Sequence, residues 1–241
     1  MLRTIWWFIQ FWAYLIWIIP TYYKIKRLEK RGDIAAHDEN TRRVVGKWAR
    51  RMIKAAGGTV TVAGLEHLPE GPAVYVGNHL GYFDIPLVLG YLGNDTKPLL
   101  SKQEIRKIPL IRSWMTELRC VFVERDNPKQ SVLALNEAAT WVRKGYSMVV
   151  FPEGTRSPDG LVHEFRGGAF RIAQKSGAMV VPFCITGTGD LMPKGSLRIR
   201  PAAVSLQVLE PIDTTGFAKE DWKALPAKCE EAIRQAQLHL I

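Results

Sequence analysis

The spacing of hydrophobic and polar positions changes at Gly57-Gly58. Before it, residues 2–19 are almost wholly apolar or aromatic, and residues 40–56 repeat apolar side chains at helical spacing, so the pattern predicts two helices. After it, short runs typical of strands alternate with stretches typical of helices. We therefore expect an N-terminal two-helix segment, residues 1–57, followed by an α/β domain, residues 58–241.

The predicted strands of the domain are short apolar runs, at 60–62, 73–76, 98–100, 120–123, 148–151, 180–185 and 204–208. The predicted helices are at 85–90, 108–118, 128–144, 168–176 and 219–240. This alternation predicts an α/β fold in which a mixed, largely parallel sheet is flanked by helices. Ligands of such sheets bind beyond the carboxyl ends of the strands, so residues that follow a strand are candidates for a site.

The first predicted helix suits a membrane. At about 1.5 Å per residue, residues 2–19 reach roughly 27 Å, against about 30 Å for a hydrocarbon core, so the helix is barely long enough to span. Its four tryptophans recur along the helix instead of bracketing it, which favours shallow insertion into one leaflet. Both arrangements stay open, and either makes the segment membrane-associated.

The second predicted helix, residues 40–56, has an apolar stripe flanked by Lys and Arg. The stripe consists of Val44, Val45, Trp48, Met52 and Ile53. A helix of this kind docks on a protein core as an ordinary surface helix or lies on a membrane. We favour the membrane, because the Trp-rich segment is adjacent and each basic residue close to anionic lipid adds about 1 kcal/mol to attachment.

The net charge of +10 is concentrated at the N-terminus. Residues 1–57 hold 12 Lys/Arg against 4 Asp/Glu, whereas the other 184 residues hold 21 against 19. A basic excess beside an apolar segment indicates an anionic membrane surface as partner and argues against nucleic acid. Five basic residues within 24–31 directly follow the first helix, and the positive-inside rule then places the domain on the cytoplasmic side.

The cysteines indicate neither a disulfide framework nor a metal site. Cys120, Cys184 and Cys229 are widely spaced, without a CxxC pair or a His at metal-ligand spacing. We expect no metal and no cofactor.

A candidate catalytic pair follows the predicted strand 73–76. A neutral imidazole at His79 can take a proton from a hydroxyl near pH 7, and a carboxylate on its other nitrogen fixes the tautomer. Asp84 supplies that carboxylate if the loop turns back, for which we expect Gly81 to provide the freedom. The alternative is a structural histidine. No Ser or Cys stands in a nucleophile elbow, which favours direct attack by the substrate's own hydroxyl.

A candidate anion site follows the predicted strand 148–151, in the segment Phe151-Pro152-Glu153-Gly154-Thr155-Arg156. Gly154 lets the backbone approach a ligand, and Arg156 can form a charge-assisted fork with phosphate. Glu153 would repel a phosphate, so we expect it to organise the site. The alternative is a tight turn. Lys102, Arg125 and Arg166 are further cations at the ends of predicted elements.

These residues match a family. The His79–Asp84 segment, residues 122–125 (Phe-Val-Glu-Arg), residues 151–156 and Val181-Pro182 resemble, in this order, the four sequence blocks of the glycerolipid acyltransferases. The closest resemblance is to the bacterial 1-acyl-sn-glycerol-3-phosphate acyltransferases, over about residues 65–190. Some positions differ from the common pattern: Gly81 replaces a frequent Ser, Glu124 a frequent Asp, and Arg112 and Arg119 frequent Gly.

The resemblance implies transfer of a fatty acyl chain from acyl-CoA or acyl-carrier protein to the sn-2 hydroxyl of lysophosphatidic acid, giving phosphatidic acid. It implies a location on the cytoplasmic face of a bacterial inner membrane, with His79 as the base and Asp84 as its partner. The acceptor site that it implies consists of Lys102, Arg125, Glu153, Gly154, Thr155 and Arg156. Two alternatives remain, namely another lysophospholipid or an amine-containing lysolipid as acceptor, and a non-enzymatic basic peripheral membrane protein.

Overall fold

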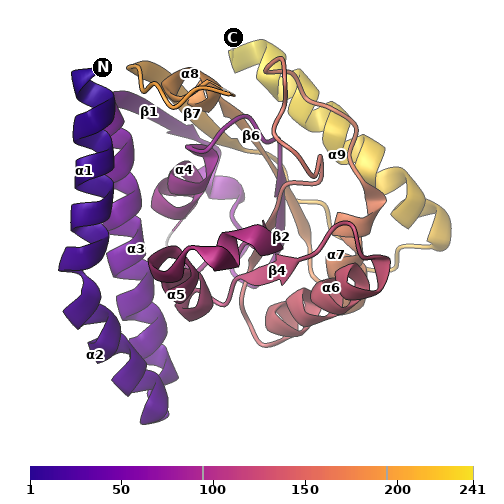
Figure 1. The fold of residues 1–241 in the computed structure, drawn as a ribbon. Helices are drawn as coiled ribbons and strands as arrows, with labels where there is room; N and C mark the ends of the chain where they lie inside the picture. Colours follow the sequence, from indigo (N-terminus) through magenta and orange to yellow (C-terminus); the bar gives the residue numbers. More distant parts are fainter. Residues whose placement is uncertain (94, 194, 241) are drawn as a thin grey trace.

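The computed structural model describes residues 1–93, 95–193 and 195–240 (Figure 1). Its central sheet has the strand order β1-β7-β6-β2-β5. These strands are β1 (Gly58–Ala63), β2 (Val74–Gly77), β5 (Met148–Val150), β6 (Val180–Thr186) and β7 (Ala202–Val208). All neighbouring strands run parallel except β6 and β7, which are antiparallel. The predicted mixed, largely parallel sheet is confirmed.

Two shorter strands, β3 (Leu100–Lys102) and β4 (Val121–Val123), form a separate parallel pair. A bridge between Leu99 and Val149 places this pair beside β5.

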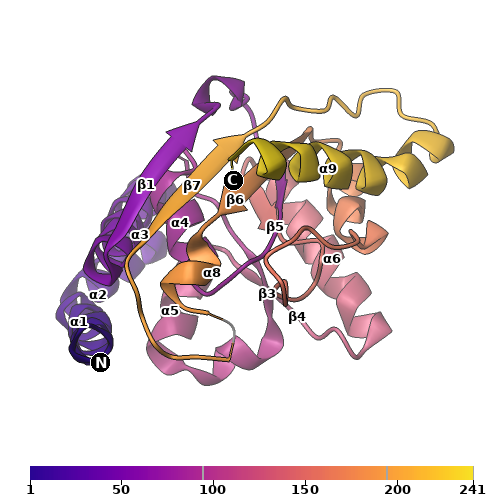
Figure 2. The same cartoon turned by 90° about the horizontal axis from the view of Figure 1, so that it is seen from above.

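Helices cover both faces of the sheet (Figures 1 and 2). One face carries α3 (Ile34–Ala56), α4 (Asp84–Tyr91) and α5 (Pro109–Glu117). The other carries α6 (Pro128–Arg143), α7 (Arg171–Ser176) and α9 (Lys219–Leu240). The short helix α8 (Thr188–Leu191) follows β6, and 3-10 turns lie at Leu65–His67, Gln103–Lys107 and Gly167–Phe170.

The central strand β2 illustrates why the sheet is buried on both sides. Its Tyr75 joins the hydrophobic cluster beneath α3 and α4, whereas Val74 and Val76 join the cluster beneath α6, α7 and α9. Successive side chains of a strand point to opposite faces, so a strand covered on both faces is a continuous apolar run. His79 lies two residues after the end of β2 and is therefore anchored by a strand that is buried on both faces.

The N-terminal segment contains three helices, where the sequence pattern distinguished two. They are α1 (Leu2–Trp17), α2 (Ile19–Lys30) and α3, and the basic stretch after the first apolar run is itself helical. Within the described residues, no single helix is both long and apolar enough to cross a membrane. The α1 and α2 pair, bent by 43°, meets those criteria of length and composition together.

The apolar stripe of α3 faces the protein, so our interpretation of it as a membrane-facing surface is wrong. Val45, Met52 and Ile53 are buried in the same cluster as Tyr75 and Phe183 of the sheet. The ordinary alternative, a surface helix docked on the core, describes α3. The boundary at residue 57 consequently marks a change of secondary structure and does not separate two hydrophobic cores.

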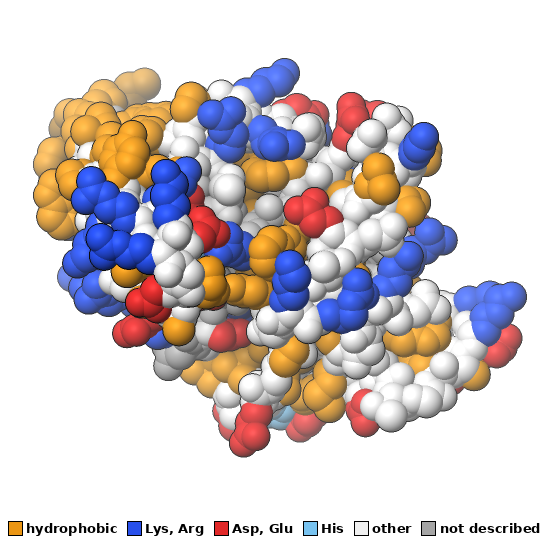
Figure 3. Space-filling view, turned by 90° about the horizontal axis from the view of Figure 1, so that it is seen from below, with side chains coloured by type: hydrophobic (Ala, Val, Ile, Leu, Met, Phe, Trp, Pro, Cys, Tyr) orange, Lys and Arg blue, Asp and Glu red, His pale blue; other side chains and the backbone are white. Residues whose placement is uncertain are grey.

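Helix α1 packs on α3 with one face and exposes the other. On the inner face, the Trp7 indole donates a hydrogen bond to the Met52 carbonyl over 2.8 Å, and its ring lies 5.3 Å from that of Phe83. The outer face of α1 consists of exposed Leu2, Ile5, Trp6, Ile9, Trp12, Ile16 and Trp17. Figure 3 shows hydrophobic side chains gathered over the N-terminal helices at one edge of the molecule, with Lys and Arg beside them.

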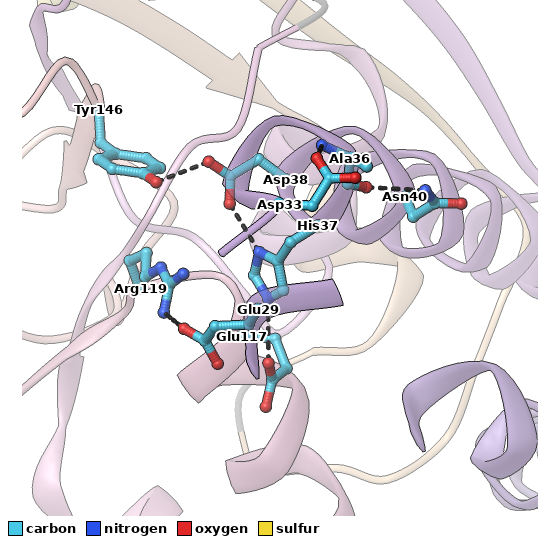
Figure 4. A network of polar contacts seen from close by, with 9 residues as sticks. All are labelled: Glu29, Asp33, Ala36, His37, Asp38, Asn40, Glu117, Arg119 and Tyr146. Carbon is cyan, nitrogen blue, oxygen red and sulfur yellow. Dashed lines mark hydrogen bonds and ion pairs between the residues drawn. The ribbon is translucent and has the colours of Figure 1, made fainter. Parts of the chain in front are cut away.

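A polar cluster around the buried His37 and Glu117, which we call the junction, joins α2, α3 and α5 (Figure 4). The imidazole of His37 lies between two carboxylates, with Nδ1 2.7 Å from Asp38 and Nε2 3.0 Å from Glu117. Arg119 pairs with Glu29 of α2 over 2.5 Å. Tyr146 extends the junction toward β5 by donating to the second oxygen of Asp38 over 2.6 Å.

Candidate active site

Two loops that leave neighbouring parallel strands form the candidate site. His79 follows β2 and Glu153 follows β5, and the register pairs Val76 with Val150. Because the carboxyl ends of parallel strands meet at one edge of a sheet, both loops lie at that edge. A hydrogen bond from the Ser157 N–H to the His79 carbonyl, over 2.7 Å, ties the two loops together.

The imidazole of His79 and the carboxylate of Asp84 are in direct contact. Nδ1 lies 2.5 Å from Oδ2 of Asp84, which is fully buried, while the His79 side chain is 19% exposed. The ring stacks on Phe151, with centroids 4.4 Å apart. The carboxylate and Phe151 fix the ring, so Nε2 is the nitrogen that can exchange a proton with a substrate.

Asp84 accepts hydrogen bonds at both oxygens. Oδ2 also receives the backbone N–H groups of Leu80 and Gly81, over 2.7 and 2.9 Å, and Oδ1 receives the hydroxyl of Thr188. A buried carboxylate needs such partners, because an unpaired charge in the interior costs several kcal/mol. We expected Gly81 to supply a backbone conformation that other residues rarely adopt, but Gly81 has no positive φ. A glycine fits here because of close packing, since a Cβ at this position would lie 3.2 Å from the Thr188 carbonyl oxygen.

Glu153 is buried behind His79. Its Oε1 accepts the backbone N–H of His79 over 2.9 Å. Burial raises the pKa of Glu153 to about 7, although hydrogen bonds from the backbones of His79 and His163 and the charges of both rings lower it. The expectation that Glu153 organises the site agrees with this position, because its carboxylate holds the backbone of the histidine.

Gly154 brings two guanidinium groups together. Its carbonyl accepts a hydrogen bond from Nη1 of Arg125, and a Cβ at Gly154, where φ is +74°, would lie 3.2 Å from Nε of Arg166. Burial first, and then the charge of Arg166, lower the pKa of Arg125, while Glu104 and Asp126 oppose the shift. Two neighbouring guanidinium groups have the chemistry to bind an anion together.

Three further residues of the predicted acceptor site are Arg156, Thr155 and Lys102. The guanidinium carbon of Arg156 stands 3.9 Å from the centroid of the Tyr82 ring, in the His79 loop. Thr155 is exposed, and Lys102 at the end of β3 pairs with Glu104 over 2.6 Å. In the described part of the chain, no side-chain hydrogen bond or ion pair joins Thr155 or Lys102 to His79, Asp84 or Glu153.

Among the residues that the structure describes, one group of side chains could hold a metal by distance alone. Ligand atoms of Glu29, His37 and Glu117 lie within 4.8 Å of one another, in the junction and not in the candidate active site. All three already have partners, His37 with Glu117 and Glu29 with Arg119. We therefore assign these residues a structural role.

Comparison with known proteins identifies the family. A family model described as Acyltransferase matches residues 59–186. The crystal structure of the 1-acyl-sn-glycerophosphate acyltransferase PlsC from Thermotoga maritima superposes with a TM-score of 0.86 at 31% identity. The match covers 99% of this chain and 95% of that one. The chain belongs to the acyltransferase family.

Curated acyltransferases of two substrate classes resemble the chain. The chloroplastic 1-acyl-sn-glycerol-3-phosphate acyltransferase LPAT1 of Arabidopsis thaliana is 42% identical over 139 residues, 57% of this chain and 38% of the relative. The lyso-ornithine lipid O-acyltransferase of Pseudomonas aeruginosa is 29% identical over 205 residues, 78% of this chain and 76% of the relative. The chain spans between 38% and 56% of the length of the plant relatives that it matches.

The sequence pattern gives no role beside His79 to three residues of the candidate site. Phe151 ends a predicted strand and opens the candidate anion segment, Thr188 lies beyond the family's blocks, and Asn78 directly precedes His79. The Asn78 side chain exchanges two hydrogen bonds of 2.8 Å with the backbone of Ile185, which fixes the end of β2 against β6. Such a long-range pair leaves no periodic signal in the sequence. The signal in the sequence was the position of Asn78, a polar residue directly after an apolar strand.

Proposed function

We propose that the protein transfers a fatty acyl chain from an acyl thioester, acyl-CoA or acyl-carrier protein, to the sn-2 hydroxyl of 1-acyl-sn-glycerol-3-phosphate, giving phosphatidic acid. The observation that carries the proposal is the His79 and Asp84 pair standing beside the guanidinium groups around Gly154 and the His79 loop. One arrangement thus offers a base for an alcohol and a cationic site for its phosphate. The likeness to PlsC supports this choice of acceptor.

In the proposed reaction, Nε2 of His79 accepts the proton of the acceptor hydroxyl while its oxygen attacks the thioester carbonyl. The new C–O ester bond forms, the C–S bond breaks, and the proton passes from His79 to the leaving thiolate. Asp84 stabilises the imidazolium that exists between these steps. Arg125 and Arg156, with Lys102 nearby, bind the phosphate, and Glu153 keeps the His79 backbone in place.

The second candidate function has the same chemistry with an ornithine lysolipid as acceptor. It is favoured by one observation, the 29% identity to the lyso-ornithine lipid O-acyltransferase over three quarters of both chains. An ornithine headgroup carries no phosphate monoester, so the cations around Gly154 favour the phosphorylated acceptor.

We further propose that the outer face of α1 holds the protein on the cytoplasmic face of a membrane. Exposed aromatic and aliphatic side chains on one side of a helix, with basic residues beside them, suit the interface of an anionic bilayer. The acceptor and the product are lipids, so attachment also brings the site to its substrate.

An acyl-transfer assay with the purified protein tests the proposal. Lysophosphatidic acid, lysophosphatidylcholine and a lyso-ornithine lipid serve as acceptors, each with acyl-CoA and with acyl-carrier protein as donor. We expect lysophosphatidic acid to react best. His79→Ala should lower turnover by roughly 10² to 10⁴-fold, the usual contribution of a positioned base. His67→Ala, which removes a half-buried histidine paired with Glu210, is the matched control and should keep full activity.

A folded His79→Ala protein with wild-type turnover would overturn the assignment of the base. Equal rates with acceptors lacking a phosphate monoester would overturn the assignment of the acceptor.

A further inference from the structure

Thr188 has no role in the reaction proposed above, but it contacts the carboxylate of Asp84. Its hydroxyl donates a hydrogen bond to Oδ1 of Asp84, and the residue is fully buried. The three other hydrogen bonds to this carboxylate all end on Oδ2. Within the described residues, Thr188 is therefore the partner of the second oxygen.

The backbone around Thr188 is built for this contact. Thr188 begins α8 directly after β6, and the preceding Gly187 has a φ of +76°. A Cβ at Gly187 would collide with the carbonyl oxygen of Ala203 on β7, so only glycine fits this turn. On the other side, Gly81 lies against the Thr188 carbonyl. The position of Thr188 is thus set by the sheet and by close backbone packing.

We propose that Thr188 is a positioning residue, which acts on the reaction through Asp84 and His79. Its hydroxyl keeps the Asp84 carboxylate oriented so that Oδ2 faces Nδ1 of His79, and it supplies the hydrogen bond that a buried charged oxygen requires. Without the hydroxyl, Oδ1 is buried without a donor, and the carboxylate rotates toward another one. The rotation weakens the hydrogen bond that fixes the His79 tautomer, so fewer rings present an unprotonated Nε2 to the substrate.

This inference rests on the proposed function for its kinetic consequence only. The geometric part concerns the imidazole of His79 and is measurable without any substrate. The Thr188 hydroxyl donates to Asp84, whereas the guanidinium of Arg125 donates to the Gly154 carbonyl, so we expect the loss of the hydroxyl to affect kcat and not acceptor binding.

The experiment compares Thr188→Val, which keeps the shape and removes the hydroxyl, with Thr188→Ser, which keeps the hydroxyl. Thr214→Val is the matched control, because the Thr214 hydroxyl is also buried and hydrogen-bonded, to the Ala178 carbonyl over 3.2 Å. For acyl transfer to lysophosphatidic acid, Thr188→Val should lower kcat by roughly 10 to 100-fold, the size of effect found when a partner that orients a metal-bound histidine is lost, with KM within about twofold. Thr188→Ser should stay within about threefold of wild type.

The second readout is the ¹⁵N NMR signal of the His79 ring, assigned by its loss in His79→Ala. Thr188→Val should change the balance of tautomers in this ring, whereas Thr188→Ser and Thr214→Val should not. If Thr188→Val does not fold, Thr188→Ala replaces it in both measurements. Should the wild-type protein lack acyltransferase activity, the proposed function fails while the NMR comparison still decides the role of Thr188. Wild-type ring signals in a folded variant without the hydroxyl, or equal losses in the Val and Ser variants, overturn the inference.

Discussion

The buried carboxylate of Glu153 accepts a hydrogen bond from the backbone N–H of His79, with its Oε1 2.9 Å from that nitrogen. This contact joins the loop after β5 to the loop after β2, so the histidine is held by its backbone as well as by its ring. Burial raises the pKa of Glu153 to about 7, against a usual value of 4.5. The carboxyl group therefore changes its charge close to neutral pH.

This shift predicts a pH dependence of stability. Between pH 4.5 and about 7 the unfolded chain has released the Glu153 proton and the folded chain still holds it, so the free energy of unfolding falls as the pH rises. The free energy of unfolding lost in this way reaches its full value above about pH 7 and is roughly 3 kcal/mol at most. Glu153→Gln removes this titration. Urea unfolding at pH 5 and pH 8 should therefore show a smaller loss for Glu153→Gln than for wild type.

The control for this measurement is Glu137→Gln, on the exposed side of α6, which should follow the wild-type pH dependence. Parallel curves for wild type and Glu153→Gln would contradict the assigned cause.

The sheet was predictable because its strands leave a local signal. Every predicted strand overlaps an observed one, since buried strands are short apolar runs bounded by turns. The contact of His79 with Asp84 was also predictable, and so was the meeting of their loop with the loop of Glu153, because the carboxyl ends of parallel strands share an edge. The contacts of Thr188 with Asp84 and of Arg166 with Gly154 did not, because they depend on how separate loops pack.

The partner of an apolar stripe was not predictable either. The stripe of α3 and the outer face of α1 have similar composition, but the first is buried in the core and the second is exposed. Hydrophobic periodicity predicts that a helix has an apolar face, but it does not predict whether protein or lipid covers that face. The Lys and Arg residues beside the stripe of α3 therefore favoured a membrane, although the protein core covers the stripe.

The position of Arg125 beside Gly154 predicts that its removal weakens the binding of a phosphorylated acceptor. Arg125→Ala removes a guanidinium that donates to the Gly154 carbonyl beside Arg166. A hydrogen bond to a charged group contributes about 1.5 to 3 kcal/mol, so KM for lysophosphatidic acid should rise roughly 10 to 100-fold, with a smaller change in kcat. The effect should vanish for an acceptor without a phosphate group. Lys129→Ala, a charge removal on the first turn of α6, is the control, and a KM that rises equally for both acceptors would refute phosphate recognition.

The outer face of α1 predicts membrane attachment. Trp6 and Trp17 are 58% and 73% exposed, so replacing both by Ser should leave the fold intact and remove apolar surface available to lipid. At about 25 cal/mol per Å² of buried apolar area, the loss should weaken binding to vesicles by tenfold or more, on the order of what two aromatic side chains contribute. Co-sedimentation with phosphatidylglycerol vesicles measures this. Trp222→Ser on α9 is the control, and unchanged binding of the double variant would exclude α1 as the attachment surface.

The junction predicts that removing Glu117 lowers the free energy of unfolding by a large amount, although Glu117 is not part of the candidate active site. His37 is fully buried and Nε2 lies 3.0 Å from Glu117, so Glu117→Ala leaves a buried polar nitrogen without its partner. Breaking a buried pair by removing one member costs roughly 3 to 5 kcal/mol, and urea unfolding should show a loss of this size. Replacing both members, as in His37→Leu with Glu117→Leu, should cost less than the sum of the two single changes, because the pair is then removed together. Glu231→Ala, on the exposed side of α9, is the control and should change the unfolding free energy by less than about 0.5 kcal/mol. Additive losses in the double variant would mean that His37 and Glu117 do not stabilise the helices as a pair.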